Sequence, residues 1–156
     1  IGIMQGRLSK MYQNKIQSFP SQSWKEEFKI ASNCGLEIIE WVFDEIYPNP
    51  ILSDEGVREI NQLMQISNIS INAICADYFM AKKLFNESQS ELEKNIESIK
   101  KLIIQANKLE ISSNSDKTIA NEIYFFIPSP PAIVQLLFES GVPDPKSRRE
   151  LSGQCN

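Results

Sequence analysis

The chain of 156 residues contains no histidine. Histidine is the usual base that activates a serine or cysteine nucleophile, so its absence excludes a Ser-His-Asp triad and a Cys-His pair. Cysteine is scarce as well. The three cysteines, Cys34, Cys75 and Cys155, are far apart in the sequence and form no CxxC pair. This pattern is typical of free thiols in a reducing compartment, and we expect Cys75 to lie in the core.

Long apolar runs and strong charge are also absent. No run approaches the roughly 18 residues that cross a bilayer, and the N-terminus lacks the basic and then apolar layout of a secretory signal. The formal net charge of -4 gives no reason to expect a nucleic-acid backbone as a partner. We therefore expect a cytoplasmic protein with no membrane or nucleic-acid partner.

What the sequence does contain is a strand-helix pattern that occurs three times. In the first unit an apolar stretch at residues 1–4 precedes the turn QGR at residues 5–7. A helix is expected after Ser23, with Glu26 completing a capping box and Gly35 ending the helix. The apolar stripe of this helix is Trp24, Phe28, Ala31 and Cys34.

The second and third units repeat this plan. Strands are expected at residues 37–43 and 69–76, and helices from near Ser53 and from about Ser90, which forms a capping box with Glu93. The apolar stripes of these two helices are Val57, Ile60, Leu63 and Met64, and Leu92, Ile96, Ile99, Ile103 and Ala106.

The spacing of three polar residues indicates how the strands are connected. Gln5, Glu40 and Asp77 end or punctuate the strands about 36 residues apart, which is the length of a strand plus a returning helix in a parallel sheet. Such units begin either a doubly wound open sheet or a closed (β/α)8 barrel. No GxGxxG or GxxxxGK[ST] loop follows the first strand, so the usual phosphate cradles of nucleotide-binding sheets are not expected.

The pattern changes after residue 111. Residues 112–118 are too polar for a buried strand, and a displaced fourth strand is expected at 123–127, with a short helix at 132–139. We therefore divide the chain into residues 1–111, the part that carries the strand-helix units, and residues 112–156, a divergent or foreign tail.

Several segments of the first part are familiar in their order and spacing. They are "GIMQGRLS", "IQSFP", "WKEEFKIASNCGLEIIEWVFD", "NPILSDEGV" and "ISINAICADYFM". Over about residues 1–110 the chain resembles the opening of the sugar phosphate isomerase/epimerase family, which has the xylose isomerase-like TIM barrel. The resemblance implies an α/β fold, a partial (β/α)8 barrel with three clear βα units and a displaced fourth.

The resemblance also implies an activity. Family members carry out metal-assisted proton transfer next to the carbonyl of a ketose or ketose phosphate, and the divalent ion (Mn, Mg, Co or Zn) stabilises the enediolate. Their metal ligands and acid/base residues lie mostly on later strands, so we assign no catalytic residue and no metal ligand here. We expect this chain to be truncated, inactive alone, and unable to bind the ion fully.

The absence of histidine limits the kind of metal site that this chain could form. A metal site in this chain would have to use carboxylates alone and would be weak. The His-rich zinc cluster of the apurinic endonucleases, which share this barrel superfamily, is excluded. The partner that the resemblance implies is a small sugar or sugar phosphate.

Candidate site residues follow from their place at strand ends. Glu40 and Asp77 would lie on the face where TIM barrels gather functional residues, and we expect them to bind substrate hydroxyls or to contact a metal held elsewhere. Gln5 and Arg7 lie in the loop after the first strand. Arg7 either anchors a phosphate or sugar oxygen or is a surface arginine.

Three further residues have two readings each. Trp41 and Tyr78 either form an apolar wall against a sugar face or pack under a helix. Gly6 permits a tight turn, and its missing side chain would also let a substrate approach the backbone.

A second function remains open for the whole chain. Three or four βα units leave a parallel sheet with an unclosed edge, and such an edge pairs readily with another strand. The alternative is therefore a non-catalytic half-barrel module that forms a homo-oligomer or pairs with another chain.

Overall fold

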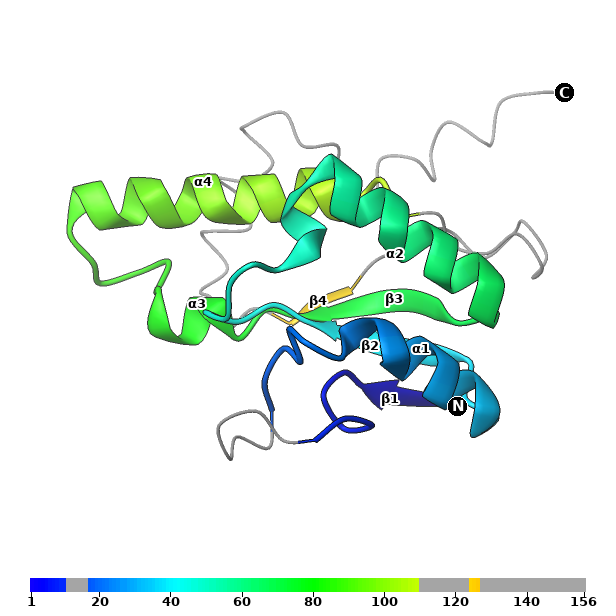
Figure 1. Cartoon of the computed structure of the whole chain (residues 1–156). Helices are drawn as coiled ribbons and strands as arrows, with labels where there is room; N and C mark the ends of the chain where they lie inside the picture. Colours follow the sequence, from blue (N-terminus) through cyan, green and yellow to red (C-terminus); the bar gives the residue numbers. More distant parts are fainter. Residues whose placement is uncertain (11–16, 110–123, 127–156) are drawn as a thin grey trace, which may run out of the picture.

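The computed structural model describes residues 1–10 and 17–109 and the backbone of residues 124–126 (Figure 1). It is a mixed α/β structure. Its elements in chain order are β1 (Gly2–Met4), α1 (Trp24–Asn33), β2 (Ile38–Val42), the 3-10 helix η1 (Pro50–Leu52), α2 (Asp54–Ser67), β3 (Ser70–Cys75), the short helix α3 (Tyr78–Ala81), α4 (Gln89–Ala106) and β4 (Tyr124–Phe126).

The strands form one parallel sheet. Its order is β1-β2-β3-β4, so each strand pairs with the strand that follows it in the chain. This confirms the parallel βα units. The strand expected at 123–127 is β4, whereas the helix expected at 132–139 and the rest of the tail lie outside the described residues.

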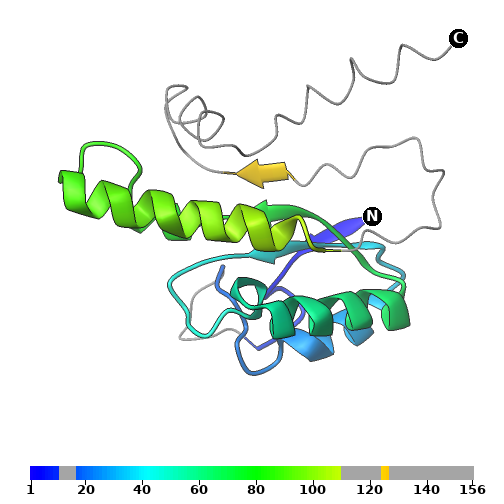
Figure 2. The ribbon, with the colours of Figure 1, turned by 90° about the horizontal axis from the view of Figure 1, so that it is seen from above.

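The long helices pack in chain order. Helix α1 contacts α2, and α2 contacts α4, so that α1 and α2 lie side by side in both views (Figures 1 and 2). Their apolar stripes share one core with the sheet, where Trp41 of β2 packs against Trp24 of α1 with ring centroids 5.6 Å apart. Within the described ranges, no helix combines the length and apolar character needed to cross a membrane.

Two of the expected helix caps are wrong. The Ser23 side chain caps nothing in α1, because the backbone already turns there and Pro20 O accepts from Trp24 N at 2.8 Å. The capping serine of α4 lies two residues earlier than expected. Ser88 Oγ, and not that of Ser90, accepts from Glu91 N at 3.3 Å.

Other predicted helix ends are confirmed. Ser53 Oγ accepts from Gly56 N at 3.0 Å at the start of α2. Gly35 ends α1 with φ 70°, and Leu36 N donates to Ala31 O, as in a Schellman motif. Cys34 was expected in the apolar stripe of α1, but it caps the helix and is exposed.

A buried carboxylate connects α1 to the turn after β1. The Glu27 side chain is only 1% exposed because it lies on the same face of α1 as Phe28 and Ala31. Gly6 N donates to its Oε2 at 2.9 Å and to its Oε1 at 3.1 Å, and Leu8 N donates to Oε1 at 3.2 Å. Glu27 thus accepts hydrogen bonds from backbone N–H groups of the turn, which have no acceptor in the sheet.

Gly6 is required by the same turn. Its φ is 85°, and a Cβ at this position would lie 2.6 Å from Ser18 O. The structure confirms the tight-turn reading, and the Ser18 carbonyl fills the space that a substrate would need to approach this backbone.

We predict that Glu27→Ala lowers the free energy of unfolding by about 3 kcal/mol, because it leaves buried N–H groups without an acceptor. Urea denaturation at pH 7 measures the effect. Glu26→Ala is the matched control, since Glu26 is the exposed neighbour on the same helix turn, and it should change stability by less than about 0.5 kcal/mol. Equal losses in the two variants would contradict the assigned role of Glu27.

Candidate functional site

The candidate site lies between the middle of β2 and the C-terminal end of β3. Glu40, which we expected at a strand end, is the third of the five residues of β2, whereas Asp77 follows the end of β3. Glu40 pairs in register with Ala73, and its side chain lies on the opposite face of the sheet from Trp41, since successive residues of a strand alternate. Partial burial, and then the charge of Asp77, raise the pKa of Glu40 above its usual range. The structure therefore brings Asp77 close enough to Glu40 for its charge to affect the ionisation of Glu40.

Asp77 belongs to a closed ring of three side chains. Gln17 Nε2 donates to Asp77 Oδ2 at 2.5 Å and to Cys75 Sγ at 3.3 Å. The Cys75 thiol donates to Asp77 Oδ1 at 3.3 Å. Both oxygens of the Asp77 carboxylate thus accept one hydrogen bond each.

The Cys75 thiol is protonated at neutral pH in this ring. Burial, the hydrogen bond and charge of Asp77 and the charge of Glu40 raise its pKa to about 12. Cys75 is half-buried, so the core position expected for it is only partly reached. A protonated thiol is a poor nucleophile, and its role in the ring is that of a hydrogen-bond donor.

Two predicted site residues are structural in this fold. Gln5 is 1% exposed. Its backbone N donates to Glu40 O, and its side-chain Oε1 accepts from Val42 N at 3.1 Å. The amide oxygen thus replaces a main-chain carbonyl where β1 leaves the sheet. Trp41 is fully buried and donates to Asn49 Oδ1 at 3.2 Å, so it lies in the core and not beside Glu40.

The remaining predicted residues lie at the rim. Arg7 is exposed on the turn after β1, and it forms no ion pair with another residue of the described part. Tyr78 is half-buried at the start of α3 and packs on Phe43, with ring centroids 5.2 Å apart. The structure thus joins Glu40 and Asp77 but does not bring Arg7 to them by any contact.

Several important residues were not predicted from the sequence. Residues 17–20, which we call the strap, cross the strand ends: Phe19 N donates to Asp44 Oδ2 at 2.9 Å, and Gln17 reaches Asp77. Asp44 follows a strand as Asp77 does, so its place in the sequence was a usable signal. Gln17 and Asn49 carry no such signal, because each is one polar residue in a loop.

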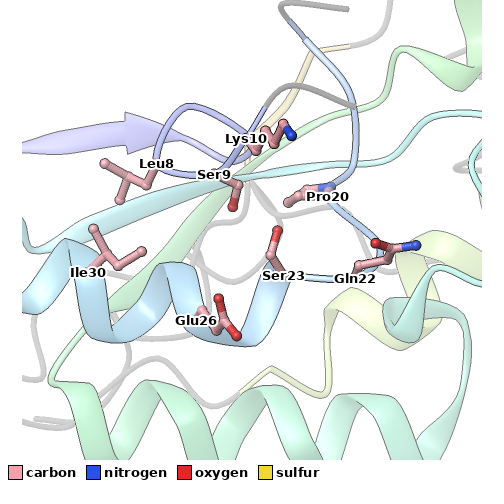
Figure 3. Close-up of a pocket in the computed structure, with 8 residues that line it drawn as sticks. All are labelled: Leu8, Ser9, Lys10, Pro20, Gln22, Ser23, Glu26 and Ile30. Carbon is pink, nitrogen blue, oxygen red and sulfur yellow. The ribbon is translucent and has the colours of Figure 1, made fainter. Parts of the chain in front are cut away.

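A separate pocket lies beside α1. It has a volume of about 360 Å³. It is lined by residues 8–10, by Pro20, Gln22 and Ser23 before α1, and by Glu26 and Ile30 of α1 (Figure 3). Figure 3 shows Ser23 and Glu26 on the helix side and Leu8 on the side of the turn. This pocket shares no lining residue with the Glu40 and Asp77 cluster.

The described residues do not fit the divalent ion that the family resemblance implies. In this part of the chain no group of three or more His, Cys, Asp or Glu side chains is arranged to hold a metal. The Asp77 oxygens already accept from Gln17 and Cys75. We therefore derive no step of the chemistry through a metal.

What the cluster can do is accept hydrogen bonds from a ligand. Two carboxylates on neighbouring strands are acceptor groups when ionised, and Asp77 retains lone pairs beyond those used in the ring. No family model and no curated protein matches the chain.

We predict that Glu40→Gln raises the melting temperature at pH 8 by a few degrees and has little effect at pH 4. The pKa of Glu40 is raised in the folded state. The protonated form therefore stabilises the fold below the unfolded-state pKa of about 4.3, and this stability is lost as the pH rises through the folded-state pKa. Glutamine, which stays neutral, does not lose it. Thermal unfolding across this pH range measures the difference. Glu45→Gln, an exposed acid of the same loop region, is the control, and a pH-independent effect of Glu40→Gln would contradict the prediction.

Proposed function

We propose that this chain is the N-terminal part of a sugar phosphate isomerase/epimerase-like protein with a partial (β/α)8 barrel. The reaction is proton transfer at the carbon next to the carbonyl of a ketose or ketose phosphate. Glu40 and Asp77 bind substrate hydroxyls in this proposal, and the acid/base groups come from outside the described residues.

One observation carries the proposal, namely the approach of Glu40, in the middle of β2, to Asp77, which follows β3 at the C-terminal edge of the parallel sheet. Parallel barrels gather their functional groups at this edge because every strand ends there. Burying two carboxylates side by side is costly without a ligand or partner, and the raised pKa of Glu40 reflects this cost. The strand order β1-β2-β3-β4, equal to the chain order, is compatible with the opening of such a barrel.

The resemblance supplies the substrate class, and the site chemistry agrees with it. Sugars present neighbouring hydroxyl donors, which suit an acceptor pair. Arg7, exposed on the turn after β1, is the candidate contact for a phosphate group in this proposal.

The direct test is calorimetric titration of the whole chain with D-fructose, D-xylulose and their phosphates. We expect Glu40→Gln and Asp77→Asn each to weaken binding about tenfold, since each removes a charged acceptor. Glu45→Gln, whose carboxylate lies 3.7 Å from Lys82 on the surface, should bind as the wild type does.

Two results would overturn the proposal. One is the absence of binding to every member of the panel, and the other is binding that neither substitution weakens. Turnover by this chain alone with Mg²⁺ or Mn²⁺ would show instead that acid/base residues are present where we have placed none.

The exposed edge of β1 favours a second candidate function, a non-catalytic half-barrel module. Among the described strands β1 pairs with β2 alone. Ile1 O and Gln5 N bond to β2, so the alternate residues Gly2 and Met4 direct their backbone groups to the other edge, where Met4 O already accepts from Arg7 N at 3.4 Å. A second copy of the chain would pair there.

We predict for this second function that the chain is a dimer in size-exclusion chromatography with light scattering. A mass near twice 17.8 kDa, maintained on dilution to about 1 μM, supports pairing of two copies. A monomer across this range excludes pairing of two copies and leaves the first function unaffected.

A further inference from the structure

We propose that Gln17 is a positioning residue of the candidate site, which fixes the Asp77 carboxylate so that Asp77 and Glu40 together accept hydrogen bonds from the neighbouring hydroxyls of a polyol. The identity of the ligand as a sugar rests on the proposed function. The link between Gln17 and Asp77 does not.

The chemistry of the ring fixes how its members are oriented. An ionised carboxylate only accepts hydrogen bonds, so the atom of Gln17 that faces Asp77 at 2.5 Å must be the amide nitrogen. The second contact of this nitrogen is the Cys75 sulfur, and the thiol proton goes to the other oxygen of Asp77. All three side chains are therefore held in one arrangement.

Gln17 is itself held from outside the ring. The strap is fixed at β2, where Phe19 N donates to Asp44 and the Phe19 ring lies 5.5 Å from that of Trp41. Ser18 O also lies close to Gly6 in the turn after β1, since a Cβ on Gly6 would be 2.6 Å from it. A segment held against the loops after β1 and β2 thus delivers an amide to the end of β3.

The ring also determines what a ligand meets. A carboxylate offers about four lone-pair positions, of which the ring uses two, so Asp77 retains acceptor capacity. Glu40 is coupled electrostatically to both Asp77 and Cys75, and no residue of the described part donates a hydrogen bond to its carboxylate. The pair is complementary to adjacent hydroxyl donors and repels an anionic group such as a carboxylate.

The first test needs no sugar. In the full chain, the side-chain amide protons of Gln17 are compared by NMR with those of Gln22, an exposed glutamine of the same connection. We expect one Gln17 proton to be shifted downfield relative to Gln22, and the shift to disappear in Asp77→Asn. A Gln17 signal that matches Gln22 in the wild type overturns the proposal.

The second test is a double-substitution cycle on the affinity for D-fructose and its 6-phosphate. We expect Gln17→Met to weaken binding about tenfold in the wild type but less than about twofold in Asp77→Asn, because it acts through Asp77. Gln22→Met is the control and should have no effect. Equal losses in both backgrounds mean that Gln17 only stabilises the loop, which overturns the positioning role.

The two proposals fail in different ways. Wild-type chain that binds neither sugar but retains the shifted Gln17 amide overturns the proposed function and supports the link to Asp77. Sugar binding that Gln17→Met leaves unchanged overturns the positioning role and supports the proposed function.

Discussion

The carboxylate of Glu27 is the constraint on which the arrangement of the strand ends depends. A chain that leaves a parallel sheet in a tight turn must find acceptors for its backbone N–H groups, and here one buried side chain of α1 accepts from both Gly6 and Leu8. Helix and turn are thereby fixed to each other. The Ser18 carbonyl then fits against Gly6, which brings the strap across the sheet.

Buried polar side chains repeat this solution along the same edge. Gln5 replaces a carbonyl of β1, Asn49 joins the Trp41 indole to Val42 O, and Asp44 accepts from Phe19 N. Each satisfies a group that the regular ladder leaves behind. Glu40 differs, because its carboxylate receives no hydrogen bond from the described residues and its pKa is raised. That contrast separates the residues that build the edge from Glu40, whose acceptor oxygens receive no hydrogen bond within the described part of the chain.

The strands and the long helices could be predicted from the sequence because each depends on local periodicity. Apolar stripes at helical spacing identified the buried faces of α2 and α4, and Gly35 identified the end of α1. The start of α1 after Ser23 was predicted correctly, but the Ser23 side chain makes no capping hydrogen bond because its backbone is not extended there. The cap at Ser90 was wrong because Ser88 offers the same side chain two residues earlier, and sequence alone does not distinguish them.

The candidate site could be predicted only in part. Asp77 follows from its place after β3, whereas Glu40 was expected at a strand end and lies in the middle of β2. Trp41 could have been separated from Glu40 as a site residue, since neighbours in a strand face opposite sides. Gln17 could not be found, because its partner is 60 residues away and is chosen by the path of the strap. Contacts of this kind depend on tertiary structure and leave no trace in local composition.

The agreement between strand order and chain order has a consequence for how the protein is made. Each strand pairs with the one synthesised before it, so a βα unit has its docking surface ready when it leaves the ribosome. The Glu27 contact lies within the first unit and can form before the third strand exists. The ring around Asp77 is different, because Gln17 must wait for β3, and the candidate site is therefore completed only after its scaffold is in place.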